Sequence, residues 1–292
     1  GAGMQTYDRF RAMDTDVDVT VEAEGFVADA LLSVRLLFEE QEAIFSRFRQ
    51  TSLLSALNRG EVVRDARFAE ACRLAIEAFE FTRGIFNPMV LPALAAAGYD
   101  RTFAEVTGGS LRPQPVPDPR DSLVIEGDTV RLRSGALDLG GIVKGWTVDL
   151  AAGLLAERGL PALVNAGGDL RAVGDEEGEG GGWLVEVTGP GGAVAWSGPC
   201  AGAMATSTIA RRRWRTNDGS EAHHLIDPRT GLPAQSPFVQ VTVRGELTWR
   251  AEAWAKSILI AGEDLVPAAL DDGYAVLALC ADGSLRSRGW EK

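Results

Sequence analysis

The sequence predicts an α+β fold with mixed, largely antiparallel sheets and packed helices. Several short apolar segments lie next to one another as hairpin-like strand pairs. Other, longer segments repeat their apolar residues at helical spacing. Strand pairs joined by short turns favour this class over a doubly wound parallel sheet.

The length, composition and charge of the chain limit its domain organisation and the ligands that it can bind. The 292 residues suit one large domain or two intimately packed halves. Hydrophobic residues make up 46% and charged residues 24% of the chain, which excludes disordered, fibrous and disulfide-stapled classes. Because 29 basic residues face 41 acidic ones and the net charge is -12, no nucleic-acid partner is expected. An anionic ligand must therefore meet a local cationic pocket.

The cysteines, the lack of a long apolar run and the N-terminus indicate where in the cell the protein is expected. Cys72, Cys200 and Cys280 are too scattered for a disulfide framework or a zinc site, so buried free thiols are expected. No apolar run approaches the ~20 residues of a membrane-spanning helix, and no membrane span is predicted. If Met4 is the natural start, a cytoplasmic location is expected, whereas an exported protein trimmed of its signal would look the same.

The first part of the chain is predicted to hold one strand and two helices. Polar and apolar residues alternate from Asp16 to Val21, as in a half-buried strand. Helices are predicted over residues 28–46 and over residues 65–83, the second with Gly84 just past its end. The proline- and glycine-rich segment 108–120 is expected to be a surface connection, and it is where two halves would divide.

The remainder is predicted to mix strands and helices. Residues 122–138 suit a hairpin that turns at Glu126-Gly127-Asp128. Helices are predicted over residues 144–158 and 249–261. Further strands are predicted over residues 162–164, 170–173, 183–188, 239–244 and 275–281.

The segment from Leu137 to Trp146 is a candidate anion site. It runs from a strand through Gly140 and Gly141 into the predicted helix, whose first turn would carry Lys144. Free N–H groups at a helix start bind anions, and a lysine there otherwise opposes the helix dipole. The plainer alternative, a tight turn with a solvated lysine, weighs about equally, and the segment matches neither GxGxxG nor the P-loop.

Two turns also carry polar groups. Residues 164–169 place Asp169 at a glycine-rich turn, where an ordinary hairpin is favoured about two to one. Residues 223–231 hold both histidines of the chain. Because adjacent residues of an extended segment point to opposite sides, His223 and His224 are not expected to chelate one metal. One of them can still face a site, and proton carriers beside a turn modestly favour function over a plain turn.

The segment 250–260 is the fourth candidate. Glu252 and Lys256 stand four residues apart in the order that suits a surface ion pair. The rest of the segment is apolar nearly all round, which slightly favours a buried helix whose charges face a partner or a cavity. The basic run Arg211–Arg215, by contrast, is expected to be a solvated strand.

Taken together and in order, these segments resemble the ApbE family of FAD:protein FMN transferases over about residues 13–262. Seven blocks in register make the resemblance specific. They are Met13-Asp14-Thr15, Phe45–Phe48 with Ser52 and Asn58, Gly84–Pro88, Asp138–Asp149, Val164–Asp169, Ala205-Thr206-Ser207 and His224–Gly231. The resemblance implies a compact α+β fold that binds FAD. It also implies that FMN is transferred, with Mg²⁺ or another divalent metal, to a threonine of an acceptor protein, with AMP released.

The resemblance implies site residues as well. Cofactor contacts are expected from Met13, Ser46, Asn58, Asp138, Gly140, Gly141, Lys144, Gly145, Gly168, Asp169, Ser207 and His224. Catalytic roles are expected for His224, as an aid to proton transfer from the acceptor hydroxyl, and for Glu252 and Lys256. Glu252 is the candidate metal ligand.

The chain also departs from the family pattern. Asp14, Asn87 and Thr208 replace a glycine, an aspartate and a glycine. Where the family usually places an aspartate and a threonine as metal ligands, this chain has Glu252 and Lys256. An ammonium group has no lone pair and repels a cation, so Lys256 is expected to supply the positive charge itself. Two alternatives therefore stay open: an FAD-binding protein without catalysis, and an FAD pyrophosphatase that yields FMN and AMP.

Overall fold

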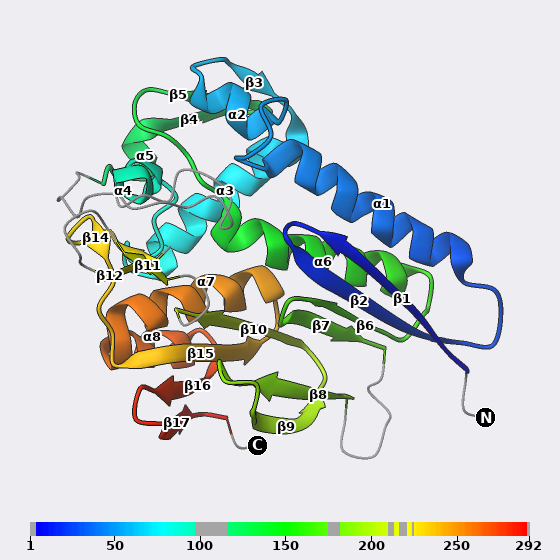
Figure 1. Ribbon diagram of the computed structural model, residues 1–292. Helices are drawn as coiled ribbons and strands as arrows, with labels where there is room; N and C mark the ends of the chain where they lie inside the picture. The colour runs from blue at the N-terminus through cyan, green and yellow to red at the C-terminus, as the bar shows by residue number, and fades with distance from the viewer. Residues whose placement is uncertain are drawn as a thin grey trace.

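The fold is built on one large antiparallel sheet. The computed structural model describes residues 4–96, 116–174, 182–209, 213–215, 221–223 and 225–290 (Figure 1). Eight strands form the sheet, in the spatial order β1 (Met4–Ala12), β2 (Thr15–Ala23), β6 (Ala162–Ala166), β7 (Asp169–Val173), β10 (Ala203–Thr208), β15 (Phe238–Gly245), β16 (Ala275–Cys280) and β17 (Leu285–Arg288). Neighbouring strands of this sheet pair antiparallel, which confirms the predicted class.

Smaller sheets surround the large one. They comprise β3 (Val63–Arg64) with β5 (Thr129–Leu132) and β4 (Leu123–Glu126), β8 (Trp183–Thr188) with β9 (Val194–Cys200), β11 (Arg213–Arg215) with β12 (Glu221–His223), and β13 (Ile226–Asp227) with β14 (Leu232–Pro233). Strands β4 and β5 are the predicted hairpin, and Gly127 in its turn has a φ of 58°. The end of the basic run is the strand β11, as expected.

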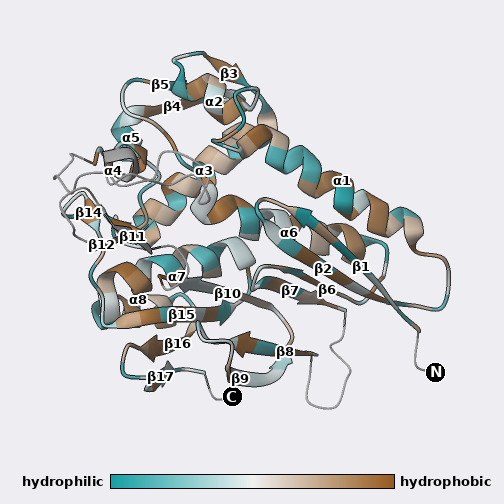
Figure 2. Cartoon of the chain, in the orientation of Figure 1, coloured by the Kyte–Doolittle hydropathy of each residue, from teal (hydrophilic) through white to brown (hydrophobic). Residues whose placement is uncertain are grey.

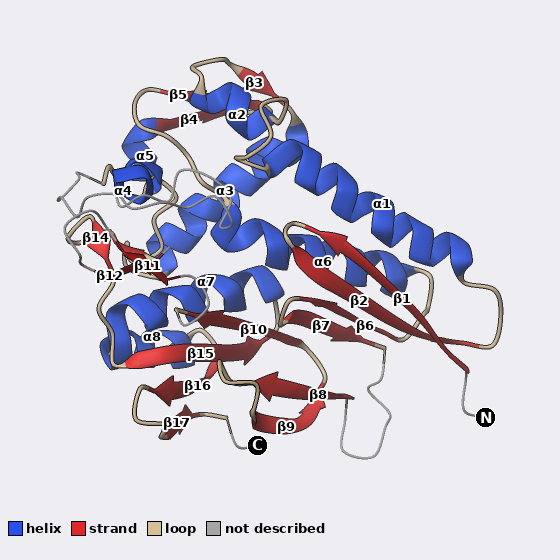
Figure 3. Cartoon of the chain, in the orientation of Figure 1, coloured by secondary structure: helices blue, strands red, loops and turns tan. Residues whose placement is uncertain are grey.

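The helices pack on the large sheet and on one another. They are α1 (Ala28–Phe45), α2 (Leu53–Asn58), α3 (Ala66–Phe81), α4 (Leu91–Ala96), α5 (Pro119–Ser122), α6 (Gly140–Glu157), α7 (Thr248–Ala261), the 3-10 turn η2 (Gly262–Leu265) and α8 (Val266–Asp271). Helix α6 lies on β6 and β7, α7 lies on β10 and β15, and α1 lies on α6 (Figure 3). The C-terminal end of α1, the start of α6 and one face of α7 thereby border one cavity, described below.

Helix boundaries follow the local chemistry of the caps. Asp65 precedes α3 and accepts a hydrogen bond from the Phe68 N–H at 2.8 Å, and Ser52 caps α2 in the same way. Gly84, just past α3, has a φ of 82°, which suits glycine. Hydrophilic and hydrophobic residues alternate along α1 (Figure 2), because one face packs on the core and the other faces solvent.

The first hairpin differs from the single predicted strand. Strand β1 alternates exposed with partly buried residues, so its polar sequence carries little strand signal. The turn to β2 holds Met13 and Asp14 at φ values of 53° and 58°. Both values lie in the left-handed region, where a two-residue hairpin turn places its central residues. The turn is therefore formed by residues other than the usual Asn-Gly pair.

The start of α6 also differs from the prediction. The helix begins at Gly140, four residues before the predicted start, so Lys144 lies in the second turn rather than the first. The expected conflict between this lysine and the helix dipole therefore does not exist, because the dipole acts within the first turn. The ammonium group has another partner, described below.

Helices α6 and α7 approach closely at Gly145. A Cβ atom on this glycine would lie 2.9 Å from the Thr248 carbonyl oxygen and from Trp249 backbone atoms. One turn further along α6, the Asp149 carboxylate accepts hydrogen bonds from the N–H groups of Thr248 and Trp249, at 2.9 and 3.0 Å. Asp149 thus caps the N-terminus of α7, which has no side-chain cap of its own.

Three remaining sequence predictions have different outcomes. Cys72, Cys200 and Cys280 are buried and unpaired, as expected. Among the described residues, no helix has the length and apolarity to cross a membrane. Most of segment 108–120 lies outside the described residues, although its end forms the start of α5. The division of the chain there stays a prediction.

The helix crossing yields a matched stability test. Gly145→Ala should lower the free energy of unfolding by about 1–3 kcal/mol, because the new methyl group overlaps backbone of α7. Gly153→Ala on the same helix is the control, because a Cβ atom there meets nothing within 4 Å. It should raise the free energy of unfolding by about 0.5–1 kcal/mol. Urea unfolding measures both, and equal effects would contradict the proposed crossing.

Candidate functional site

A cavity of about 690 Å³ opens where the ends of the central helices meet the sheet. Its walls come from the β1–β2 turn, the C-terminal end of α1 and the loop after it, the start of α6, the β6–β7 turn, the end of β10 and one face of α7. Blocks far apart in the sequence are therefore brought to one place.

Ten of the predicted site residues line this cavity. They are Met13, Ser46, Asp138, Gly140, Gly141, Lys144, Asp169, Ser207, Glu252 and Lys256. Asn58 and Gly145 do not line it, and Gly168 stands beside Gly167, which does. His224 lies outside the described residues.

The centre of the site is a pair of carboxyl groups beside a lysine. Lys144 Nζ lies 3.1 Å from Asp169 Oδ2, and Asp169 is only 1% exposed. Glu252 accepts a hydrogen bond from the Gly145 N–H at 2.9 Å, and its carboxyl group neighbours that of Asp169. The arrangement links α6, α7 and β7 through side chains that face the cavity.

Burial raises the pKa of Glu252 well above its ordinary value of 4.5. The negative charge of Asp169 raises this pKa further, whereas Lys144 and the Gly145 N–H lower it. Two neighbouring carboxyl groups cannot both ionise at low cost, so the uncharged form of Glu252 is favoured more than in a free glutamate.

Lys256 lies across the start of α6. A Cβ atom on Gly141 would lie 3.0 Å from Lys256 Nζ and 2.7 Å from Phe86 Cε2. Gly141 therefore leaves room for the lysine side chain against the helix backbone. Asp138 accepts a hydrogen bond from the Gly140 N–H at 3.0 Å, next to this crossing. Lysine side chains from α6 and α7 consequently border the same cavity.

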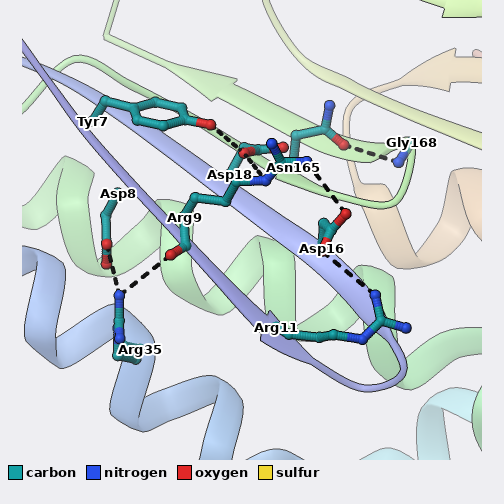
Figure 4. A network of polar contacts seen from close by, with 9 residues as sticks. All are labelled: Tyr7, Asp8, Arg9, Arg11, Asp16, Asp18, Arg35, Asn165 and Gly168. Carbon is teal, nitrogen blue, oxygen red and sulfur yellow. Dashed lines mark hydrogen bonds and ion pairs between the residues drawn. The ribbon is translucent and has the colours of Figure 1, made fainter.

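The opposite wall is tied to the first hairpin. Glu42 of α1 accepts a hydrogen bond from the Met13 N–H at 2.8 Å and pairs with Arg49. Arg11 bonds to Asp16 across the hairpin, within a ladder of charged pairs along β1 and β2 (Figure 4). Such exposed ion pairs contribute little stability each, but they fix how the turn lies beside the cavity.

Predicted residues outside the cavity wall support it. Asn58 donates to the Leu137 carbonyl at 2.9 Å and accepts from the Leu137 N–H at 2.8 Å. It thereby holds the segment that leads into α6, which is a loop and not the predicted strand. The Gly168 N–H donates to Asn165 Oδ1 at 2.9 Å (Figure 4), and this glycine has a φ of 99°. These contacts position Asp138 and Asp169.

Sequence reasoning missed part of the lining. Gln41, Glu42, Arg11 and Arg49 border the cavity, yet none was singled out. Gln41 and Glu42 belong to an amphipathic helix, where polar residues are expected to face solvent. Gln41 is 0% exposed on the buried face of α1, but no pattern in the sequence indicates this burial. That burial becomes visible only once α1 is packed on α6.

The donor set does not fit a resident metal ion. The Glu252 carboxyl group is engaged by Gly145 and Asp169, and Lys256, four residues along α7, offers an ammonium group in place of a ligand. Among the residues that the structure describes, no group of three His, Cys, Asp or Glu side chains is arranged to hold a metal. Cationic charge at this wall of the cavity comes from lysine.

The fold and this site place the chain in a known family. Its residues 13–278 match the ApbE family, so the chain belongs to that family, and the resemblance seen in the sequence is confirmed.

Relatives by sequence include the FAD:protein FMN transferase of Treponema pallidum, which is 28% identical over 285 residues, covering 86% of this chain and 76% of the relative. The enzyme of the same name from Vibrio cholerae is 28% identical over 250 residues, covering 78% and 72%. The chain is thus homologous to flavin transferases over most of its length.

Solved structures show the same fold. The ApbE protein of Thermotoga maritima superposes with a TM-score of 0.87 at 24% identity, covering 98% of this chain and 97% of that one. The flavinyl transferase ApbE of Pseudomonas stutzeri gives a TM-score of 0.84 at 20% identity, covering 99% and 96%. The antiparallel sheet with helices packed on it is therefore the fold of these transferases.

The raised pKa of Glu252 predicts a pH dependence of stability. The folded protein binds this proton more tightly than the unfolded chain does. The resulting stabilisation is complete below the ordinary carboxyl pKa and is lost as pH rises towards the folded pKa. Each unit by which the pKa is raised corresponds to about 1.4 kcal/mol.

Glu252→Gln resembles the protonated carboxyl group and cannot ionise. As the pH rises from about 5 to about 8, the range in which proteins are usually most stable, the variant should therefore lose less stability than the natural protein. Urea unfolding across that range measures the difference. Parallel pH profiles for the two proteins would contradict a raised pKa of Glu252.

Proposed function

We propose that this chain binds FAD in the cavity and transfers FMN from it to a threonine hydroxyl of an acceptor protein, with AMP released. The observation that carries the proposal is the cluster of Lys144, Asp169, Glu252 and Lys256 in a cavity of about 690 Å³, on the fold of the flavin transferases. The two ammonium groups suit the pyrophosphate of a dinucleotide.

The reaction can be written with its atoms balanced. The threonine Oγ forms a bond to the phosphorus of the FMN half, and the bond from that phosphorus to the oxygen of AMP breaks. The hydroxyl proton must leave, and His224 is the group that the family resemblance predicts to assist. Lys144 and Lys256 would stabilise the negative charge on the phosphate oxygens as the bonds exchange.

The proposal assigns to Lys256 the charge that a metal ion would otherwise supply. Its stem lies against Gly141, and its ammonium group borders the same cavity as Lys144. One ammonium carries half the charge of a magnesium ion and cannot orient several oxygens as a multi-ligand template. We therefore propose that FAD is held without metal and that transfer is slow.

A second candidate function is FAD binding without catalysis. The observation in its favour is that Lys256 borders the cavity. Lysine side chains can bind a pyrophosphate, but binding of this kind does not by itself activate a nucleophile. Incubation with FAD and a candidate threonine-bearing acceptor, followed by mass spectrometry, separates the candidates. An acceptor heavier by one FMN supports transfer, free FMN indicates hydrolysis, and intact FAD indicates binding alone.

Lys144→Ala should weaken FAD binding by about 1–3 kcal/mol, because the variant removes a charge-assisted contact at the centre of the cavity. Quenching of flavin fluorescence on titration measures the affinity. Arg64→Ala removes an exposed positive charge from β3 and is the matched control. Equal affinities of Lys144→Ala and the natural protein would refute the role of Lys144.

Metal removal gives a further test. FAD affinity of the natural protein should be the same with EDTA as with excess magnesium, because Lys256 supplies the charge in place. In a Glu252→Asp, Lys256→Thr double variant, with oxygen donors at both positions, magnesium should increase FAD affinity. If the FAD affinity of the natural protein depended strongly on magnesium, the proposed role of Lys256 would be contradicted.

A further inference from the structure

A second cavity, of about 460 Å³, lies at the other end of β10 from the cavity that Lys144 and Lys256 border. It is bordered by the ends of β9 and β15 and by the starts of β10 and β16. Part of its wall is main chain, because four glycines line it: Gly202, Gly245, Gly273 and Gly289. The two cavities share no lining residue, so the second is a separate candidate site.

Arg244 is the only charged residue among the described residues that line the second cavity. Its guanidinium carbon lies 4.2 Å from the centre of the Trp290 ring and 5.5 Å from the centre of the Trp196 ring. The two rings meet edge to face, with their centres 5.2 Å apart. A guanidinium that lies over aromatic rings still has N–H groups in its own plane that can donate to another group.

The charge of Arg244 is not neutralised within the part of the chain that the structure describes. Its guanidinium forms neither an ion pair nor a hydrogen bond there, and burial lowers its pKa from the ordinary value. Arg171 and Arg250 are also partly buried, but each pairs with an aspartate, at 2.9 and 2.7 Å. Burying a charge without a partner costs free energy, so an anion bound to Arg244 would recover part of that cost.

The guanidinium of Arg244 is accessible and lies beside the cavity wall. Its nitrogen atoms retain accessible surface, in contrast to the fully buried Nε of Arg171. The guanidinium is close enough to the thiol of Cys200 for the two groups to interact electrostatically. Cys200 lines the same cavity and donates from Sγ to the Gly202 carbonyl at 3.5 Å. A ligand in the cavity can therefore reach the charged group.

We propose that the second cavity binds a small organic anion, whose carboxylate or phosphate group accepts hydrogen bonds from Arg244. A guanidinium can donate two parallel hydrogen bonds to either group. The compact apolar body of the ligand packs against Leu270 and Pro199 of the lining. No described acidic residue lines the cavity, so the field of Arg244 is not opposed there, although the chain as a whole carries a net charge of -12. The inference does not depend on the proposed function, because the two cavities are separate.

Calorimetric titration with two probes, phenylacetate and phenyl phosphate, tests the proposal. At least one of them should bind, with one molecule per chain, and the tighter of the two identifies the preferred anionic group. Phenylacetamide, a neutral counterpart of phenylacetate, should bind about 10-fold more weakly or less than the preferred anion, as for loss of a charge-assisted hydrogen bond. If neither anion binds the natural protein, or if the amide binds as tightly, the inference is overturned.

Arg244→Met removes the charge and keeps an unbranched apolar side chain over the two tryptophan rings. The affinity for the preferred anion should fall by about 10- to 100-fold. Arg244→Lys keeps a charge without the planar fork, so it should also bind the anion more weakly than the natural protein does. If Arg244→Met melts at a lower temperature than the natural protein, Arg244→Lys supplies the test. Unchanged anion affinity in the folded variants would contradict the role of Arg244.

Two further variants locate the bound anion. Arg288→Met removes an exposed positive charge from β17, beside the cavity but not in its lining, and should leave the anion affinity unchanged. Lys144→Ala should also leave it unchanged, because Lys144 borders only the first cavity. Loss of anion binding in Lys144→Ala but not in Arg244→Met would place the anion in the first cavity and overturn the inference. The FAD affinity of Arg244→Met should equal that of the natural protein.

Discussion

The close crossing of α6 and α7 at Gly145 is the constraint on which the site depends. Because this residue has no side chain, the backbones of the two helices approach within contact distance. Glu252 can then reach the Gly145 N–H and meet Asp169 on the strand beyond. A side chain at Gly145 would separate the helices and break the carboxyl pair. The contact at Gly145 thus determines both how α6 packs on α7 and where the carboxyl groups of the site lie.

A second set of contacts connects the helix crossing to the large sheet. Asp149 of α6 caps α7 and also pairs with Arg171 of β7 at 2.9 Å. Arg171 stands two residues after Asp169, so both side chains project from the same face of the strand towards α6. Fixing Arg171 therefore fixes the place of Asp169. Burial raises the pKa of Asp149, and its hydrogen bonds to α7 and its pairing with Arg171 offset part of this rise.

Elements with their own periodicity or caps were predictable from the sequence. The helix after Asp65 and the hairpin around Gly127 fall where the pattern placed them. Strand β1 was missed because an edge strand without a buried face has no apolar alternation. In the site, Lys144 and Asp169 were found through nearby glycines, whereas Gln41 was not, because only the packing of α1 on α6 buries it. Burial of polar groups between distant elements leaves no local signal.

The burial of Glu252 affects the electrostatics of the cavity. A raised pKa favours the uncharged form of this carboxyl group, so the lysine side chains Lys144 and Lys256 meet less opposing negative charge. On a chain with a net charge of -12, a dinucleotide pyrophosphate meets a favourable field only at such cationic side chains. Desolvation where α7 packs on α6 is the largest cause of the raised pKa of Glu252. The packing of α7 on α6 therefore makes this wall of the cavity less negative than the rest of an acidic chain.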